Sequence, residues 1–140
     1  MSVHPVRLRR IHAFISIAGG DLKGAKLLAA EARAQAMFLA QQSVEKLLRA
    51  VIEADDKRAG TTHNIAELAA LLSSKHELYD RFLEFDDLSG ASTRYRYPTS
   101  AGHEIHPPTQ ASFANTLQEI DSLTKQVVEF LEQQQLYRQD

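Results

Sequence analysis

The sequence predicts an all-α protein, an antiparallel up-and-down bundle of four to five helices. Long segments near the start, in the middle and at the end of the chain carry apolar residues at alternating steps of three and four, which is the period of an amphipathic helix. No segment shows the alternation of apolar and polar residues typical of a strand. A chain of 140 residues suffices for one core, so we expect a single domain over residues 1–140.

The first helix is predicted over residues 6–31, after Pro5, which suits a first helical turn. Its apolar stripe is Leu8, Ile11, Ile15, Ala18, Leu22, Ala25 and Ala29. This register crosses Gly19-Gly20 without a change of phase, which favours one helix with a kink at the glycines. The alternative is a second helix that begins at Asp21, a suitable N-cap residue.

The central helix is predicted over residues 34–54, because the segment has no Gly or Pro and consists mostly of good helix formers. Its apolar face is Ala36, Ala40, Val44, Leu47, Leu48, Val51 and Ile52. Its polar face is Gln41, Gln42, Glu45, Lys46, Arg49 and Glu53. Glu45 lies four residues before Arg49, the favourable order for an ion pair on a helix surface.

The segment after the central helix begins with a polar loop that contains Gly60. Asn64 and Glu67 match a capping box, so a helix is predicted directly after Asn64. Ser74 and Glu77 repeat this signature ahead of a helical stretch that extends to about residue 89. The pattern is compatible with two helices or with one bent helix.

The last helix is predicted after Pro107-Pro108, with Thr109 as its cap, and extends to about Leu136. Its stripe is Phe113, Leu117, Ile120, Thr124, Val127 and Leu131. Four apolar residues of the first and last helices lie outside these stripes and are candidates for a homodimer seam: Phe14, Ile17, Val128 and Phe130.

Residues 89–110 have no apolar period and hold three of the four prolines, so we expect a long functional loop. No acidic residue lies between Asp87 and Glu104. The candidate ligand-binding residues of the loop are Arg94, Tyr95, Arg96, Tyr97 and His103. Guanidinium groups bind phosphate and tyrosine rings stack on bases, which indicates a nucleotide or RNA. The alternative is that the tyrosines pack against the bundle and the arginines pair with Asp86, Asp87 or Glu104.

Composition limits the other classes of function. The net charge of −2 gives no global case for nucleic-acid binding, so such a site must be local. The absence of cysteine excludes disulfides, thiolate metal sites and a cysteine nucleophile. We therefore expect a cytoplasmic protein, with no membrane segment and no cofactor. The histidines of the loop, His103 and His106, lack the spacing of a metal site.

Four segments, in order DLKGAKLLAAEA, FLAQQSVEKLLRAVIEA, THNIAELAALL and STRYRYP, resemble the HEPN family, whose name refers to higher eukaryotes, prokaryotes and nucleotide binding. The resemblance spans nearly the whole chain. It implies a four- or five-helix up-and-down bundle that forms a homodimer. It also implies a partner, a minimal nucleotidyltransferase encoded nearby, in a toxin–antitoxin-like two-component system.

Some HEPN branches are metal-independent ribonucleases that use an arginine and a histidine with four to six residues between them. Arg96 and His103 have six residues between them, so the resemblance implies that they are a catalytic pair. The residues that follow the arginine, Tyr97 and Pro98, differ from the small polar residue usual in that pattern. A structural or nucleotide-contacting role for RYRYP is the alternative.

His63 directly precedes Asn64 and the predicted helix. At this position we favour a structural role, as a cap or a bridge to a neighbouring helix, and the alternative is a nucleotide contact near the loop. The favoured function is thus a dimeric module that binds nucleotide, RNA or a nucleotidyltransferase. The other two classes are a ribonuclease that uses Arg96 and His103, and a purely structural interaction subunit.

Overall fold

The computed structural model describes residues 3–139 and is an all-α bundle, as predicted, with no strand in this range. Three long helices form the frame: α1 (Pro5–Leu28), α2 (Arg33–Ala54) and α6 (Gln110–Gln133). Four short elements lie between α2 and α6: α3 (Ile65–Ala69), α4 (Tyr79–Leu83), the 3-10 helix η1 (Asp86–Leu88) and α5 (Ala91–Arg94). None of the helices among these residues is both long and apolar enough to cross a bilayer.

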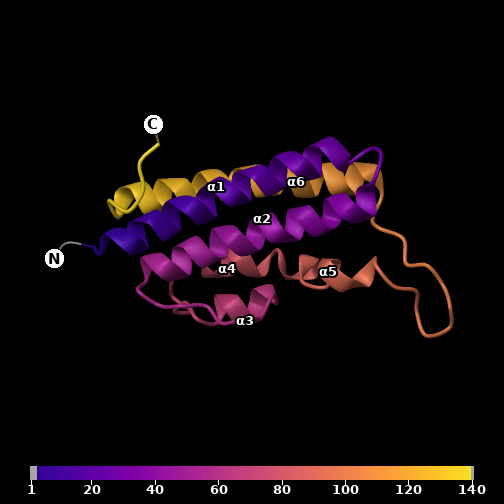
Figure 1. The fold of residues 1–140 in the computed structure, drawn as a ribbon, viewed down its shortest axis with the longest axis horizontal. Helices are drawn as coiled ribbons and strands as arrows, with labels where there is room; N and C mark the ends of the chain where they lie inside the picture. Colours follow the sequence, from indigo (N-terminus) through magenta and orange to yellow (C-terminus); the bar gives the residue numbers. More distant parts are fainter. Residues whose placement is uncertain (1–2, 140) are drawn as a thin grey trace.

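The helix α2 lies at the centre of the bundle, with α1 and α6 on one side and the short elements on the other (Figure 1). The chain passes along α1, returns along α2, moves back along the short elements and returns again along α6 (Figure 1). The up-and-down topology is therefore confirmed, with a series of short helices in the place of one long third helix. This series forms a layer over α2, which we call the short-helix layer (residues 62–97).

The first helix is continuous across Gly19 and Gly20, so the predicted single helix is confirmed and a new helix at Asp21 is wrong. Asp21 instead lies inside α1, where its carboxylate is 3.4 Å from the Lys46 ammonium on α2. A Cβ atom added at either glycine would have no neighbour within 4 Å. The α1 helix ends at Leu28, three residues before the predicted end.

The predicted apolar face of α2 is buried, but its predicted polar face is not simply exposed to solvent. Gln41, Glu45 and Glu53 are buried as well, because the short-helix layer and α1 cover flanks that the sequence pattern assigned to water. Ser43 lies inside the α1–α2 contact, where its hydroxyl donates to the Ala18 carbonyl over 2.8 Å. The prediction of a one-sided amphipathic helix was therefore wrong for these polar residues.

The helix α3 begins directly after Asn64, as predicted, and Asn64 Oδ1 accepts the Glu67 amide at 2.9 Å. Its other free amides also have side-chain acceptors: Thr62 Oγ1 for Asn64, Ser89 Oγ for Ile65 and Asp86 Oδ1 for Ala66. The start of α3 is thus bonded to η1 and to Ser89, and no backbone donor of its first turn is left unpaired. These bonds join the start of the short-helix layer to the η1 turn and the residue that follows it.

The second predicted cap was wrong. The helix α4 begins at Tyr79, with Leu78 at the cap position and no side-chain cap, whereas Ser74 lies in the preceding turn. The predicted stretch to residue 89 is divided into α4 and η1, and its apolar residues are buried as predicted. These residues are Leu78, Phe82, Phe85 and Leu88.

Residues 89–110 are not a loop throughout. They begin with the end of the η1 turn and α5, whose Ala91 is buried, and residues 95–109 contain no helix. Thr109 caps α6 as predicted, since its hydroxyl oxygen accepts the Ser112 amide at 3.1 Å. The α6 helix ends at Gln133, before the predicted end, because Gln135 adopts a left-handed conformation with φ 59°.

Candidate functional site

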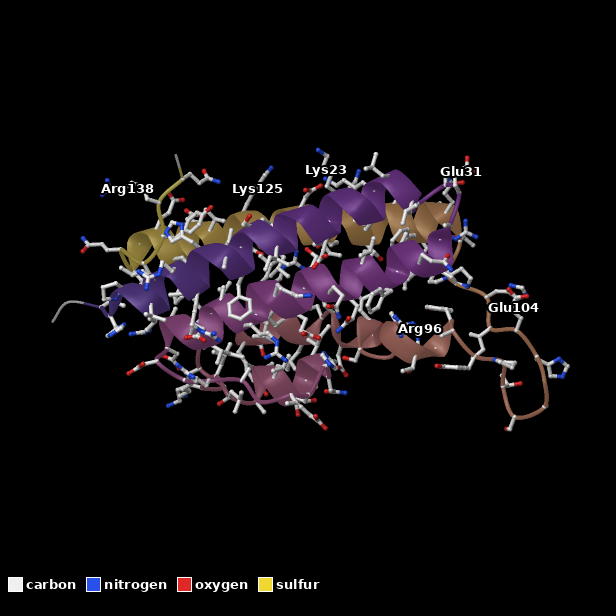
Figure 2. The ribbon with its side chains drawn as sticks, viewed as in Figure 1. Lys23, Glu31, Arg96, Glu104, Lys125 and Arg138 are labelled. Atoms are coloured by element: carbon white, nitrogen blue, oxygen red, sulfur yellow. The ribbon has the colours of Figure 1, made fainter. Side chains whose placement is uncertain are left out.

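Arg96 lies against the first part of α2. Its guanidinium carbon is 4.9 Å from the centre of the Phe38 ring, within the range of a cation–π contact. A pocket of about 110 Å³ lies beside this contact, and it is lined by Ala34, Gln35, Phe38, Ala91, Tyr95 and Arg96. Arg96 lies on the same side of α2 as α5 (Figure 2). The contact holds the guanidinium over the ring, and its nitrogens form no hydrogen bond within residues 3–139 and are available for a ligand.

Arg94 folds back over Gly90. A Cβ atom at Gly90 would lie 2.8 Å from Arg94 Nη2, so a larger residue there would displace the end of the Arg94 side chain. Within residues 3–139, neither Arg94 nor Arg96 forms a side-chain hydrogen bond or an ion pair, with Asp86, Asp87 and Glu104 included. Asp86 instead accepts from the Ala66 amide and the Ser89 hydroxyl. The predicted alternative of arginine–acid pairing is therefore not formed.

The surface around these arginines has no acidic side chain from either segment that builds it. Neither residues 32–44 nor residues 88–103 contain Asp or Glu. These two segments supply Arg33, Arg94 and Arg96, and Arg33 Nε donates to the Pro108 carbonyl over 2.6 Å. In a chain with a net charge of −2, this arrangement produces a local positive field. A positive field attracts a phosphate-bearing ligand, which is negatively charged.

The segment between α5 and α6, which contains His103, extends away from the bundle (Figure 1). The Thr99 amide donates to the His103 carbonyl over 2.8 Å, and the His103 amide donates to Thr99 Oγ1 over 3.0 Å. Gly102, with φ +84°, allows the turn to close. Among the described residues, no hydrogen bond joins Arg96 to His103. Arg96 packs on α2 while His103 lies on this separate turn.

His63 bridges to α2, and the predicted bridge to a neighbouring helix is thereby confirmed, whereas the cap is Asn64. Its Nδ1 is 2.9 Å from Oε1 of the buried Glu45, while the His63 side chain is 62% exposed. An ionised carboxylate only accepts hydrogen bonds, so the imidazole proton is assigned to Nδ1. The other ring nitrogen, Nε2, has no hydrogen-bond partner within residues 3–139.

Glu45 is the centre of a network of which sequence reasoning predicted only the ion pair with Arg49, and that pair is confirmed. Gln41 Nε2 donates to Oε1 over 3.0 Å, and Arg49 Nε donates to Oε2 over 3.1 Å. Burial raises the pKa of Glu45, but the hydrogen bonds from His63, Gln41 and Arg49 outweigh burial and hold its pKa below the ordinary value. Glu45 is therefore ionised at neutral pH. The signal in the sequence was the i, i+4, i+8 spacing of Gln41, Glu45 and Arg49.

The two parts of the site share one face of α2. Phe38, Gln41, Glu45 and Arg49 follow one another at steps of three and four, so their side chains lie along one stripe. Arg96 contacts Phe38, and His63 contacts Glu45, seven residues further along this stripe. At a rise of 1.5 Å per residue, about 10 Å of helix separates the two contacts. The structure therefore brings His63 to the same face as Arg96.

Tyr95 and Tyr97 differ in exposure. Tyr95 is half-buried and packs against the core, as one alternative predicted for both tyrosines, whereas Tyr97 is 69% exposed. Among the residues that the structure describes, no three His, Asp or Glu side chains gather as a set of metal ligands.

A family model described as the HEPN domain matches residues 11–136. Neither the curated proteins nor the solved structures gave a match to the chain. The match extends from the second turn of α1 to Leu136, three residues after the end of α6, so it includes all the short elements and the arginines of α5 and the following turn. With its helical bundle and this match over most of its length, the chain belongs to the HEPN domain family.

Proposed function

We propose that this protein binds a nucleotide or RNA through the surface formed by Arg94, Tyr95, Arg96 and Tyr97, which we call the RYRY surface. The observation that carries the proposal is the position of Arg96, stacked on Phe38 with no acidic partner among the described residues. Arginines held for a structural purpose in this protein, such as Arg49 and Arg81, are paired with carboxylates. Membership in the HEPN family favours the same nucleotide- or RNA-related role.

The chemistry of the RYRY surface fits a phosphate-bearing ligand with a base. Two guanidinium groups form charge-assisted hydrogen bonds with phosphate oxygens. The exposed Tyr97 ring offers a stacking surface for a base, a contact that every base can form. The small pocket beside Arg96 and Phe38 is too small for a whole base, so the ligand lies on the surface rather than in a cavity.

The first prediction concerns the double variant Arg94→Ala/Arg96→Ala. We expect RNA binding to weaken at least tenfold, because each lost charge-assisted hydrogen bond contributes about 1.5 to 3 kcal/mol. The slope of log K against log salt should fall by about 1.4, since two phosphate contacts to a single strand are lost. The unfolding free energy should change by less than about 1 kcal/mol, because both side chains are exposed. Fluorescence anisotropy with a labelled RNA oligonucleotide and chemical denaturation measure the two quantities.

The matched control is Lys23→Ala/Lys125→Ala. It removes the same two charges from exposed positions on α1 and α6, on the opposite side of the molecule from Arg96 (Figure 2). Its RNA affinity should stay within about twofold of the wild type. An equal loss of RNA affinity in both variants would show that net charge alone accounts for the effect. Unchanged RNA binding in the arginine variant would contradict the proposed site and would favour a purely structural subunit.

A homodimer is the second part of the proposal. Of the four residues predicted as a seam, Val128 is buried and both Phe14 and Phe130 pack partly on the core, so only Ile17 is exposed. The large apolar side chains that α1 exposes are this Ile17 at 50%, Leu27 at 72% and Val6. Val6 and Ile17 are 11 residues apart, and Ile17 and Leu27 are 10 residues apart. Both spacings are close to three full helical turns, so the three side chains lie on one face of α1.

The second prediction follows from this face of α1. Wild-type protein should sediment as a two-chain species at micromolar concentration, and Ile17→Glu/Leu27→Glu should sediment as a monomer. The control is Gln118→Glu/Ser122→Glu, which adds the same charge at exposed positions of α6 and should remain dimeric. A monomeric wild type at all micromolar concentrations would contradict the dimer. A dimeric Ile17→Glu/Leu27→Glu variant would show that the interface does not lie on this face of α1.

The family resemblance extends the proposal to a partner, a minimal nucleotidyltransferase in a toxin–antitoxin-like pair. The RYRY surface and the α1 face lie on different helices, so a dimer through α1 leaves the RYRY surface open to a partner or to RNA. A small nucleotidyltransferase encoded next to this chain, and its co-purification with it, would support the two-component system.

A further inference from the structure

We infer that the small pocket between the start of α2 and the end of α5 binds the terminal phosphate group of a nucleotide or of an RNA strand, which is a phosphate monoester. The inference rests on the proposed function, because the rest of the ligand lies on the RYRY surface. It specifies which phosphate the site selects: one on a mononucleotide or at the end of a strand, in preference to a phosphodiester inside a strand.

The volume of the pocket fits a phosphate group and no larger part of a nucleotide. The pocket measures about 110 Å³, which is room for about three or four waters at about 30 Å³ each and is comparable to one phosphorus atom with its four oxygens. Pockets that hold a whole small molecule begin at about 300 Å³. A phosphate inside a strand bears a nucleoside on each side, and neither nucleoside fits, so only a terminal phosphate can enter.

The polar side chains of the pocket wall can all donate hydrogen bonds, and none has a partner. Gln35, Tyr95 and Arg96 line the pocket, and their side chains form no hydrogen bond within residues 3–139. By contrast, Gln41 and Gln42 of the same helix both donate to other side chains. A terminal phosphate has three free oxygens, so the three unpaired donor groups match it in number.

The charge around the pocket also matches a phosphate monoester. The Arg96 guanidinium lies over the ring of Phe38, and the Arg94 guanidinium carbon is 6.0 Å from the centre of the Tyr95 ring, the other aromatic ring of the wall. None of the residues that line the pocket is acidic. A phosphate monoester carries about −1.5 to −2 charges at pH 7, whereas each phosphate inside a strand carries a single one. Two guanidinium groups therefore balance the monoester.

The first turn of α2 adds a smaller contribution to this positive charge. Ala32, at the cap position, forms no side-chain cap bond, and the amides of Ala34 and Gln35 have no acceptor within residues 3–139. The uncapped start of a helix carries a partial positive charge. Both of these residues line the pocket, so the charge acts at short range on a group held there and supplements the guanidinium groups.

The third prediction is tested by fluorescence anisotropy with single-stranded RNA oligonucleotides of one sequence, labelled at an internal base. One has a 5′-phosphate, one has a 3′-phosphate, and one has hydroxyl groups at both ends. Wild-type protein should bind at least one phosphorylated oligonucleotide at least about tenfold more tightly than the hydroxyl oligonucleotide, because the pocket adds charge-assisted hydrogen bonds.

Two variants of α2 connect this preference to the pocket. Gln35→Glu places a carboxylate on the pocket wall, and Ala34→Leu fills the pocket without a change of charge. Each should reduce the ratio of the two affinities to within about twofold. Because the ratio is measured within one variant, a change in overall affinity or in the folded fraction cancels. The matched control is Gln118→Glu, which adds the same charge at an exposed position of α6 that does not line the pocket, and it should keep the wild-type ratio.

Competition with adenosine 5′-monophosphate separates the two sources of a terminal phosphate, with adenosine as the control that lacks phosphate. Displacement of the phosphorylated oligonucleotide by the monophosphate at an affinity within about tenfold of its own would identify a mononucleotide as the ligand, and weaker displacement would identify an RNA end. Equal binding of all the oligonucleotides by the wild type, or a preference that persists in both pocket variants, would overturn the pocket and leave RNA binding intact. A wild type that binds neither RNA nor the monophosphate would overturn the proposed function as well, so the two failures are distinguishable.

Discussion

Replacement of Phe82 by Ala is expected to lower the free energy of unfolding by about 3 to 5 kcal/mol, the usual range for a large ring removed from a core. Phe82 is fully buried and is the one buried residue of α4. A helix of five residues has no stability of its own in water, so α4 depends on this ring for its attachment. The loss should therefore fall near the upper end of the range.

Chemical denaturation followed by circular dichroism measures this loss. Tyr97→Ala serves as the control, because it removes an aromatic ring that is exposed and should change stability by less than about 0.5 kcal/mol. If Phe82→Ala cost no more than the control, α4 would be held by other contacts and the short-helix layer would not depend on its apolar core.

Arg49→Ala is expected to cost about 3 kcal/mol, because it leaves the buried Glu45 carboxylate without its cation. The variant also loses two hydrogen bonds, from Arg49 Nη1 to the Gly60 carbonyl and from Nη2 to the Thr62 carbonyl. These bonds attach the loop that carries His63 to α2. The control is Lys26→Ala, whose pair with Asp121 is nearly half exposed on both sides and should contribute less than about 1 kcal/mol.

The effect of Arg49→Ala should depend on pH in a defined direction. The pKa of Glu45 in the folded protein is lower than its ordinary value of 4.5. A carboxylate of this kind stabilises the fold above its unfolded pKa, and the contribution is lost as pH falls through the folded pKa. The stability difference between wild type and Arg49→Ala should therefore be constant near neutral pH and shrink below about pH 4.5. A difference that persists in acid would show that the loop bonds, not the ion pair, carry the effect.

The long helices were predictable because one local rule determines them. Apolar steps of three and four place residues such as Ile11, Ile15 and Ile120 on faces that are indeed buried. The rule also predicted correctly that α1 crosses Gly19-Gly20. It failed at residues 74–94, where Ser74 and Glu77 offered a cap that the chain does not use. There the backbone follows long-range bonds, such as that from the Ala66 amide to Asp86, and a local signature contains no information on them.

The candidate site was predictable in its residue types and not in its arrangement. The arginines and tyrosines of the RYRY surface were identified because that segment has no apolar period and no acid. The bond between His63 and Glu45 joins residues 18 positions apart, and only the return of the chain along α2 brings them together. Glu45 was assigned to the solvent side of its helix because a pattern shows where one face is apolar, and it does not show that a second layer will cover another face.

The helices of the short-helix layer are short, and this affects both the sequence of folding events and the affinity for a ligand. The antiparallel α1–α2 pair is joined by residues 29–32 and consists of near neighbours in sequence, so it can form early and with little loop entropy. The elements α3, α4 and α5 span five, five and four residues, and they acquire helical order only on a finished α2. This layer is therefore the unit that opens locally at the lowest free energy. Because it carries His63, Arg94 and Arg96, part of any binding free energy goes into holding it closed, and ligand affinity is coupled to the order of these helices.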